Sequence, residues 1–170
     1  MARYAVFLRA VNVGGTGKLP MADLKAMCLD ASYTDVQTYI ASGNVVLSTS
    51  QSADQVRQEI ESRLEAYAGK KVDVMVRTPE DLDLILRTNP FAEHDPKKSV
   101  VVFLHSTPSA DALDHHSGRK AEELALGERE IYIYFPDGMG RSKLRLKAAQ
   151  DGTTRNINTV RKIRDMAGGT

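Results

Sequence analysis

The chain lacks the features that define several common protein classes. It has one cysteine, Cys28, so no internal disulfide can form, and a reducing cytoplasm fits this. No apolar run approaches the ~20 residues that a membrane-spanning helix needs. Residues 1–4 lead directly into a strand pattern, and we therefore expect no signal peptide. These absences predict a cytoplasmic protein that does not enter a membrane.

Net charge is also nearly absent. The 170 residues include 23 basic and 22 acidic side chains, for a formal net charge of +1. Such a balance argues against a general nucleic-acid coat and against binding to acidic membranes. Hydrophobic residues make up 42% of the chain, which is enough for a core. The length allows one domain or two small, intimate ones.

The most distinctive stretch, residues 8–20, lacks the motif that it first suggests. Its glycine-rich loop ends in Gly17-Lys18, as a phosphate-binding P-loop does. That motif needs a glycine where Asn12 stands and a hydroxyl where Leu19 stands, so a Walker-type nucleotide site is rejected. The glycine spacing also fails the dinucleotide-binding fingerprint. What remains is a glycine-rich loop before a helix, where backbone N–H groups and the helix N-terminus favour anion binding. The alternative interpretation of this loop is a flexible strand-to-helix connection without a ligand.

Signatures of catalysis and metal binding are missing as well. There is no nucleophile elbow, no Ser/His/Asp pattern and no distinctive carboxylate pair. Asp114, His115 and His116 form a short cluster, but adjacent histidines on a helix point in different directions. Cys28 lies in an apolar helical pattern and is interpreted as a core residue. We therefore expect no metal and no cofactor, and we identify no general base.

The first half of the chain predicts an α+β fold with a ferredoxin-like order, β-α-β-β-α-β. Alternating apolar residues indicate strands, and apolar residues at helical spacing indicate helices between them. Ser52 and Asp54 are candidate caps, and Gly69 ends the second helix. The expected strands are 3–10, 35–40, 45–48 and 72–76, and the expected helices are 20–31 and 54–68.

The second half, residues 79–170, predicts a further mixed α/β unit that packs with residues 1–78 as one compact body. Thr78 and Pro79 indicate the start of a helix. Strands are expected at 99–105 and 130–135. Helices are expected at 110–125, 143–149 and 156–167.

Basic and polar residues recur where loops meet predicted helices. Residues 12–18, 140–143 and 153–156 each combine them, and such residues near a helix N-terminus suit an oxyanion. The alternatives are capped loops and, at the last helix, a solvated basic face. Arginines and the lysine would neutralise charge, and asparagines would orient the ligand. The candidate ligand-binding residues are Arg9, Asn12, Lys18, Asn44, Arg155 and Asn156.

Four short motifs together resemble the uncharacterised bacterial domain-of-unknown-function family 1697. They are residues 8–15, 20–24, 42–45 and 154–160, and the resemblance covers essentially the whole chain. The family usually has a glycine where Ala10 stands and an aromatic residue where Ile157 stands. The resemblance implies a mixed α/β fold with ferredoxin-like halves and no established activity. It also implies that the first loop, the Ser-Gly-Asn turn and the start of the last helix lie close together.

The leading functional hypothesis is a binding module for an anionic or phosphate-containing small molecule. An enzyme of unknown reaction in the same pocket is the first alternative. Single-stranded nucleic-acid binding through the sheet is another, but the third strand offers Val45 and Leu47 rather than stacking aromatics. A purely structural or protein-interaction role is the last. We expect neither a nucleic-acid nor a membrane partner. The oligomeric state does not follow from the sequence.

Overall fold

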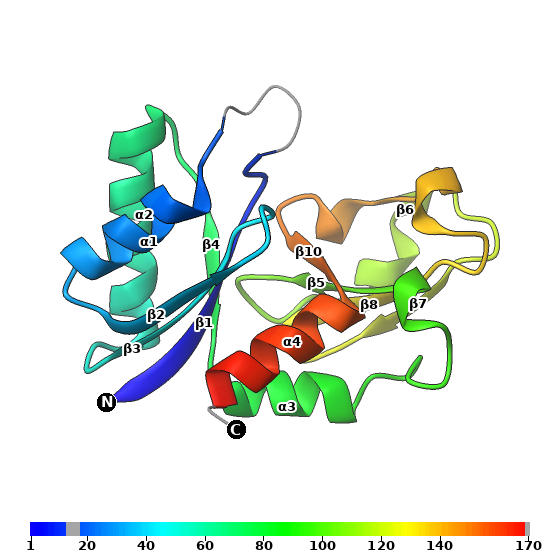
Figure 1. The fold of residues 1–170 in the computed structure, drawn as a ribbon. Coiled ribbons are helices and arrows are strands. Elements are labelled where there is room, and N and C mark those ends of the chain that lie inside the picture. The colour runs from blue at the N-terminus through cyan, green and yellow to red at the C-terminus, as the bar shows by residue number, and fades with distance from the viewer. Residues whose placement is uncertain (13–17, 169–170) are drawn as a thin grey trace. The chain divides into compact units, whose positions relative to one another are not determined.

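A computed structural model describes residues 1–12 and 18–168 (Figure 1). The chain forms two compact units. The first comprises Met1–Leu82 together with the chain from Ile163 onward, and the second is Asp83–Lys162. The fold class is α+β, as predicted, with four α-helices and antiparallel sheets in the described ranges. The sequence-based boundary at residue 78 lies four residues before this division. The packing of both parts as one body stays a prediction.

The first unit contains the predicted order of elements. Its four strands form one sheet in the order β2-β3-β1-β4, and each neighbouring pair is antiparallel. This order is compatible with the predicted ferredoxin-like arrangement. The elements are β1 (Ala2–Leu8), α1 (Met21–Asp30), β2 (Thr34–Tyr39), β3 (Asn44–Thr49), α2 (Ala53–Ala68) and β4 (Val74–Arg77).

Local capping explains where the helices of this unit begin and end. The Ser52 side chain accepts a hydrogen bond from the Gln55 backbone, and the Gln55 side chain accepts one from the Ser52 backbone, which forms a capping box for α2. Gly69 ends α2 in the left-handed conformation, with φ of 72°. Pro20 precedes α1 at the N-cap rather than occupying its first turn. Ser52 and Gly69 are therefore confirmed as the ends of α2, whereas Asp54, the other candidate cap, lies in its first turn. Helix α1 begins at Met21, one residue later than predicted.

The core of the first unit lies between one face of the sheet and helices α1 and α2, which cover that face together (Figure 1). Val6 of central strand β1 is opposite Val45 of β3 and Val76 of β4, and these three side chains belong to this core. Phe7 points to the other face and is also fully buried. Burial on both faces fits the sequence of β1, which has apolar side chains on both faces.

The second unit is built on a sheet in the order β10-β5-β8-β7, again with antiparallel neighbours. A separate two-stranded pair joins β6 and β9. Helix α3 (Pro79–Arg87) directly follows Thr78, whose hydroxyl accepts a hydrogen bond from the Asp81 backbone at 3.0 Å. Helix α3 and helix α4 (Ile157–Gly168) each have residues in both units. The strands of the second unit are β5 (Ser99–Phe103), β6 (His116–Ser117), β7 (Glu123–Leu126), β8 (Glu130–Tyr134), β9 (Arg145–Leu146) and β10 (Thr153–Asn156).

The helix predicted at residues 110–125 is wrong. A short 3₁₀ turn at Ala112–Asp114 is followed by strands β6 and β7. Gly118 interrupts the segment with φ of 69°, and an added Cβ there would collide with the Lys143 carbonyl oxygen. Leu124 of β7 is opposite Ile133 of β8 and packs against the core of this unit. Pairing with a neighbouring strand outweighs the helix propensity of the Ala- and Leu-containing segment.

Two further segments differ from the prediction for a related reason. The expected helix at 143–149 is strand β9 followed by a 3₁₀ turn at Lys147–Ala149. Residues 153–156, expected as a polar loop leading into the last helix, form strand β10, which pairs with β5, and the helix itself begins at Ile157, one residue later than predicted. The strands that pair with β9 and β10 are β6 and β5, which lie far away in the sequence. The local sequence pattern therefore does not indicate that these segments are strands.

Candidate functional site

Strand β1 ends in a backbone segment with an uncommon conformation. Ala10 and Asn12 have φ angles of 55° and 57°, in the left-handed region. Asparagine tolerates this region better than most residues because its short polar side chain can bond locally. The segment is anchored where it leaves the sheet: the Leu8 N–H donates to the Gly43 carbonyl and the Arg9 N–H to the Asp73 carbonyl, both at 2.9 Å.

Asn12 acts as a clamp on the chain that follows. Its Oδ1 accepts a hydrogen bond from the Leu19 N–H at 2.6 Å, and its Nδ2 donates to the Leu19 carbonyl at 2.8 Å. The same Nδ2 donates to the Ala41 carbonyl at 2.7 Å, in the β2–β3 turn. One amide group thus fixes the position of Leu19, beside Lys18, relative to two other segments.

The β2–β3 turn fits closely against the end of β1. Gly43 has φ of 90°, and a Cβ built on it would lie 2.7 Å from Val11 Cγ2 and 2.9 Å from Leu8 Cβ. Only glycine both adopts this positive φ at no steric cost and has no Cβ that would collide with Val11 and Leu8. The fully buried Asn44 side chain donates to the Tyr39 carbonyl at 2.8 Å and to Ser42 Oγ at 3.0 Å. The structure therefore brings residues 8–12 of the first motif and residues 42–44 of the third motif together.

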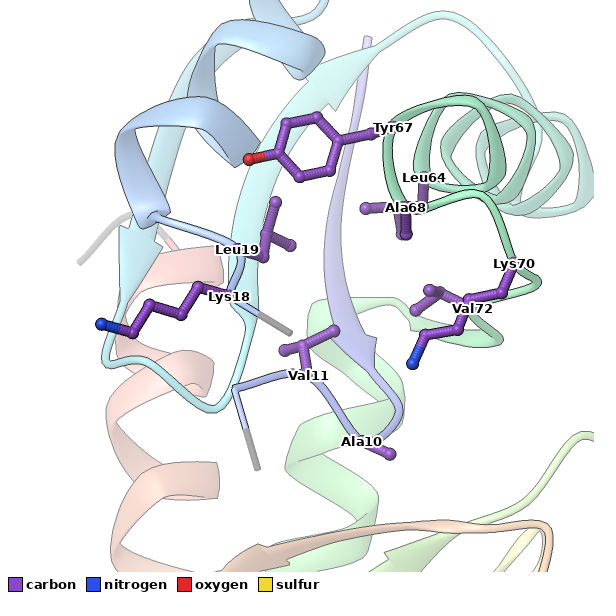
Figure 2. A pocket seen from close by; sticks show the side chains of 9 residues that line it. All are labelled: Ala10, Val11, Lys18, Leu19, Leu64, Tyr67, Ala68, Lys70 and Val72. Atoms are coloured by element: carbon purple, nitrogen blue, oxygen red, sulfur yellow. The ribbon is translucent and has the colours of Figure 1, made fainter. Parts of the chain in front are cut away.

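A pocket of about 250 Å³ lies in the first unit, between this segment and the end of helix α2 (Figure 2). Most of its walls are aliphatic. The lining residues are Ala10, Val11, Lys18, Leu19, Leu64, Tyr67, Ala68, Lys70 and Val72. Of the six predicted ligand-binding residues, only Lys18 is among them. Asn12 shapes the pocket indirectly, because it holds Leu19, and Arg9 is half-buried at the end of β1.

Two exposed lysines border the pocket, and they are oriented differently. In Figure 2 the Lys70 side chain runs back along Val72, and its ammonium group points to the side formed by Ala10 and Val11. The Lys18 ammonium group points away from the other labelled side chains. Within the described residues, neither lysine takes part in an ion pair or a side-chain hydrogen bond. Their charge is therefore available to a ligand.

Tyr67 forms the wall opposite Val11 in Figure 2. Its hydroxyl donates a hydrogen bond to Asp23 Oδ2 at 2.8 Å. This hydrogen bond raises the pKa of Tyr67 above its ordinary value. Because the hydroxyl is already engaged, Tyr67 contributes mainly its ring face to the pocket.

The predicted residues Arg155 and Asn156 lie in the second unit, at the end of β10. Asn156 directly precedes α4, and its Oδ1 accepts a hydrogen bond from the Asn158 N–H at 2.8 Å, so Asn156 lies at the predicted helix start. Arg155 is buried, its Nη1 donates to the Thr154 carbonyl at 3.0 Å, and burial lowers its pKa to about 10. Asn156 Nδ2 donates to the Lys97 carbonyl at 3.3 Å. A cavity shared by residues 12–17 and 155–158 stays a prediction, and residues 13–17, with three of the loop's glycines, lie outside the described residues.

The second unit has a smaller cleft of about 30 Å³ near Glu122 and Ser142. Ser142 Oγ donates to Glu122 Oε2 at 2.5 Å, and the Lys120 N–H donates to Glu122 Oε1 at 2.5 Å. The Ser142 hydrogen bond, followed by the backbone of Lys120, lowers the pKa of Glu122. Residues 140–143, predicted as an anion-binding helix start, are therefore tied to a carboxylate of the same chain.

Cys28 has the predicted role in the core. The residue is almost completely buried, and burial raises the pKa of its thiol to about 12. Among the described residues, no three His, Cys, Asp or Glu side chains are grouped so that they could hold a metal ion. None of the described helices has the length and apolar character needed to cross a membrane.

Comparison with known proteins places the chain in a family. The family described as "Protein of unknown function (DUF1697)" matches residues 1–132. The chain belongs to this family. No curated protein matches. A solved structure, that of the conserved bacterial protein SP0830 from Streptococcus pneumoniae, is 23% identical, with a TM-score of 0.80 over 98% of each chain. At this identity the likeness shows the fold alone.

The geometry explains one feature of the DUF1697 resemblance. A glycine is typical where Ala10 stands, and Ala10 has a φ of 55° that favours glycine. The residues that sequence reasoning missed, Lys70 and Tyr67, come from the end of α2 and the loop after it. Two adjacent lysines directly after Gly69 are a weak signal, because basic residues there also complement the helix dipole.

Proposed function

We propose that this DUF1697 protein is a binding protein for a small organic anion, which it takes into the pocket of the first unit. The observation that supports this most directly is the pocket of about 250 Å³ bordered by Lys18 and Lys70. Cavities lined mostly by apolar side chains with a few polar groups are the usual form of small-molecule sites. Here those polar groups carry positive charge, which matches the anionic ligand expected from the sequence.

The backbone around the pocket supports the same function. Ala10 and Asn12 have left-handed φ angles, and so does the exposed β-branched Ile40 of the β2–β3 turn. Such backbone conformations cost free energy, and they are concentrated at binding sites, where they hold the residues of the site in one arrangement. Asn12 links this turn to Leu19 of the pocket wall. We infer that the two asparagines of the motifs, Asn12 and Asn44, shape the site, and that Lys70 and Lys18 supply the charge.

Isothermal titration calorimetry of the full chain tests the proposal, with carboxylates and phosphates as probes. We expect Lys70→Ala to weaken anion binding by about two- to fivefold, the effect of losing one exposed charge pair. Lys71→Ala is the matched control, because Lys71 is exposed and adjacent but does not line the pocket. Lys18→Ala should have the smaller effect of the two pocket variants, since its ammonium group points outward (Figure 2).

Three results would contradict the proposal. They are the absence of binding to every anion, equal losses in the Lys70 and Lys71 variants, and a submicromolar, salt-sensitive affinity for single-stranded oligonucleotides. The last would indicate a nucleic-acid partner, because neutralising phosphates makes binding strongly dependent on salt.

A further inference from the structure

The walls of the pocket restrict the chemistry of the ligand beyond its charge. Six of the nine lining residues are aliphatic: Ala10, Val11, Leu19, Leu64, Ala68 and Val72. The Tyr67 hydroxyl is engaged by Asp23, so the ring face is what remains for a ligand. A sugar phosphate or a free phosphate would bring several polar atoms into this space and find few partners. Unpaired polar groups are costly to bury, so the body of the ligand has to be apolar.

The volume sets the size of that body. A cavity of about 150 Å³ in an apolar protein interior holds a benzene molecule, and drug-sized ligands occupy pockets of about 300–1,000 Å³. The pocket of this protein, at about 250 Å³, lies between these values. It therefore has room for one ring or one short alkyl chain together with part of an acid group.

The charge is placed at the border of the pocket and not at its base. Leu64 is almost fully buried and Val72 is buried, whereas Lys70 is exposed. In Figure 2 the Lys70 ammonium group is directed back past Val72. A ligand with an apolar body against Leu64 and Val72 would therefore present its acid group to Lys70, near the solvent.

We propose that the ligand is an amphiphilic monoanion, with one acid group on a short alkyl or single-ring body that fills the pocket beside Leu64, Val72 and Tyr67. This rests on the proposed function, since it specifies the ligand of the same site. Burial of the hydrocarbon body supplies most of the affinity, and the lysines select the acid. Inorganic phosphate, which has no such body, binds weakly or not at all.

Ala68 offers a way to fill the pocket without disturbing the core. It is an exposed residue on the last turn of α2, and its small side chain lines the pocket. Ala68→Phe places a ring in the space where the ligand body would lie. Ala66→Phe is the matched control, because Ala66 is exposed on the same helix and does not line the pocket.

The experiment is calorimetric titration of the full chain with butanoate, hexanoate, octanoate, hexanol and inorganic phosphate. We expect about a fourfold gain in affinity per added methylene, equivalent to about 0.8 kcal/mol, until the pocket is full. Hexanol, which has the same chain and no charge, should bind more weakly than hexanoate. Ala68→Phe should remove the dependence on chain length, and Ala66→Phe should leave it unchanged.

The outcomes separate this inference from the proposed function. Phosphate binding as tight as octanoate, with no effect of chain length, would overturn the apolar body but keep an anion site. Equal binding of hexanol and hexanoate would overturn the anion site and with it the monoanion. A chain-length effect that survives in Ala68→Phe would place the hydrocarbon elsewhere and overturn the inference.

Discussion

Each unit of the molecule contains a hollow bordered by lysines, and the two hollows use their polar groups in opposite ways. In the second unit, the cleft of about 30 Å³ is bordered by Lys120 and Lys143, and the Glu122 carboxylate there accepts hydrogen bonds from Ser142 and Lys120. In the first unit, the pocket of about 250 Å³ has aliphatic walls and exposed lysines. Polar residues around a hollow therefore indicate a ligand only where the protein has not already satisfied them.

This comparison implies that the amide that shapes the open pocket matters more for stability than the charges around it. Asn12→Ala removes three hydrogen bonds and leaves alanine in a left-handed conformation. We expect a loss of about 2–4 kcal/mol in the free energy of unfolding, measured by urea denaturation. Asn12→Gly is the control: it keeps the backbone conformation and should recover up to about 1 kcal/mol. A loss below about 1 kcal/mol in the alanine variant would mean that the clamp does not organise this region.

The cleft of the second unit, near Glu122 and Ser142, predicts a smaller effect on the free energy of unfolding, and this effect depends on pH. Ser142→Ala removes the main hydrogen bond to Glu122, and we expect a loss of about 1–2 kcal/mol at pH 7. The pKa of Glu122 is lowered in the folded protein from its ordinary value of 4.5. The stabilisation is therefore complete above about pH 4.5 and is lost as the pH falls through the folded-state pKa.

Unfolding curves of the wild type and Ser142→Ala should accordingly converge in acid. The measurement is urea denaturation of both proteins between pH 7 and pH 3. A difference that stays constant over this range would show that the serine acts through packing and not through the carboxylate.

The smallest expected effect concerns the open pocket. Lys70→Ala and Lys71→Ala should each change the free energy of unfolding by less than about 0.5 kcal/mol, because both lysines are exposed. Differential scanning calorimetry without ligand measures this. A clear destabilisation by Lys70→Ala alone would show that its charge is structural, and the contrast between the two hollows would disappear.

Local patterns were sufficient to predict much of the first unit. The Ser52 cap and Gly69 are short-range signals, and they bound helix α2 as expected, although the part of Gln55 in the capping box was not predicted. The strand expected at residues 3–10 is β1, and its apolar side chains on both faces fit its burial on both faces. These elements are specified by residues within a few positions of one another, which is the range that sequence reasoning can use.

The second unit and the site depended on distant partners. Leu124 is in a strand because it is opposite Ile133, and Arg155 is in a strand because it is opposite Val101. Lys18 was predicted from its glycine-rich loop, but Lys70 joins it only through the folding of α2 against the sheet. Conversely, Asn44 carries the right chemistry for a ligand, yet it is buried and hydrogen-bonded within its own turn. Neither the position of Lys70 beside the pocket nor the burial of Asn44 in its turn can be inferred from spacing along the chain.

The first unit is discontinuous, and this has a consequence for biosynthesis. Arg3 in β1 donates through Nη2 to the Met166 carbonyl in α4 at 3.2 Å, although the two residues are 163 positions apart in the sequence. The ribosome adds about 5–20 residues per second, so the 80 residues between Leu82 and Ile163 take about 4–16 s to synthesise. During that interval the emerging first unit lacks its final segment. The nascent chain must therefore hold its β-α-β-β-α-β portion in an unfinished state while the intervening unit is made, and the closing step of folding waits for translation to reach α4.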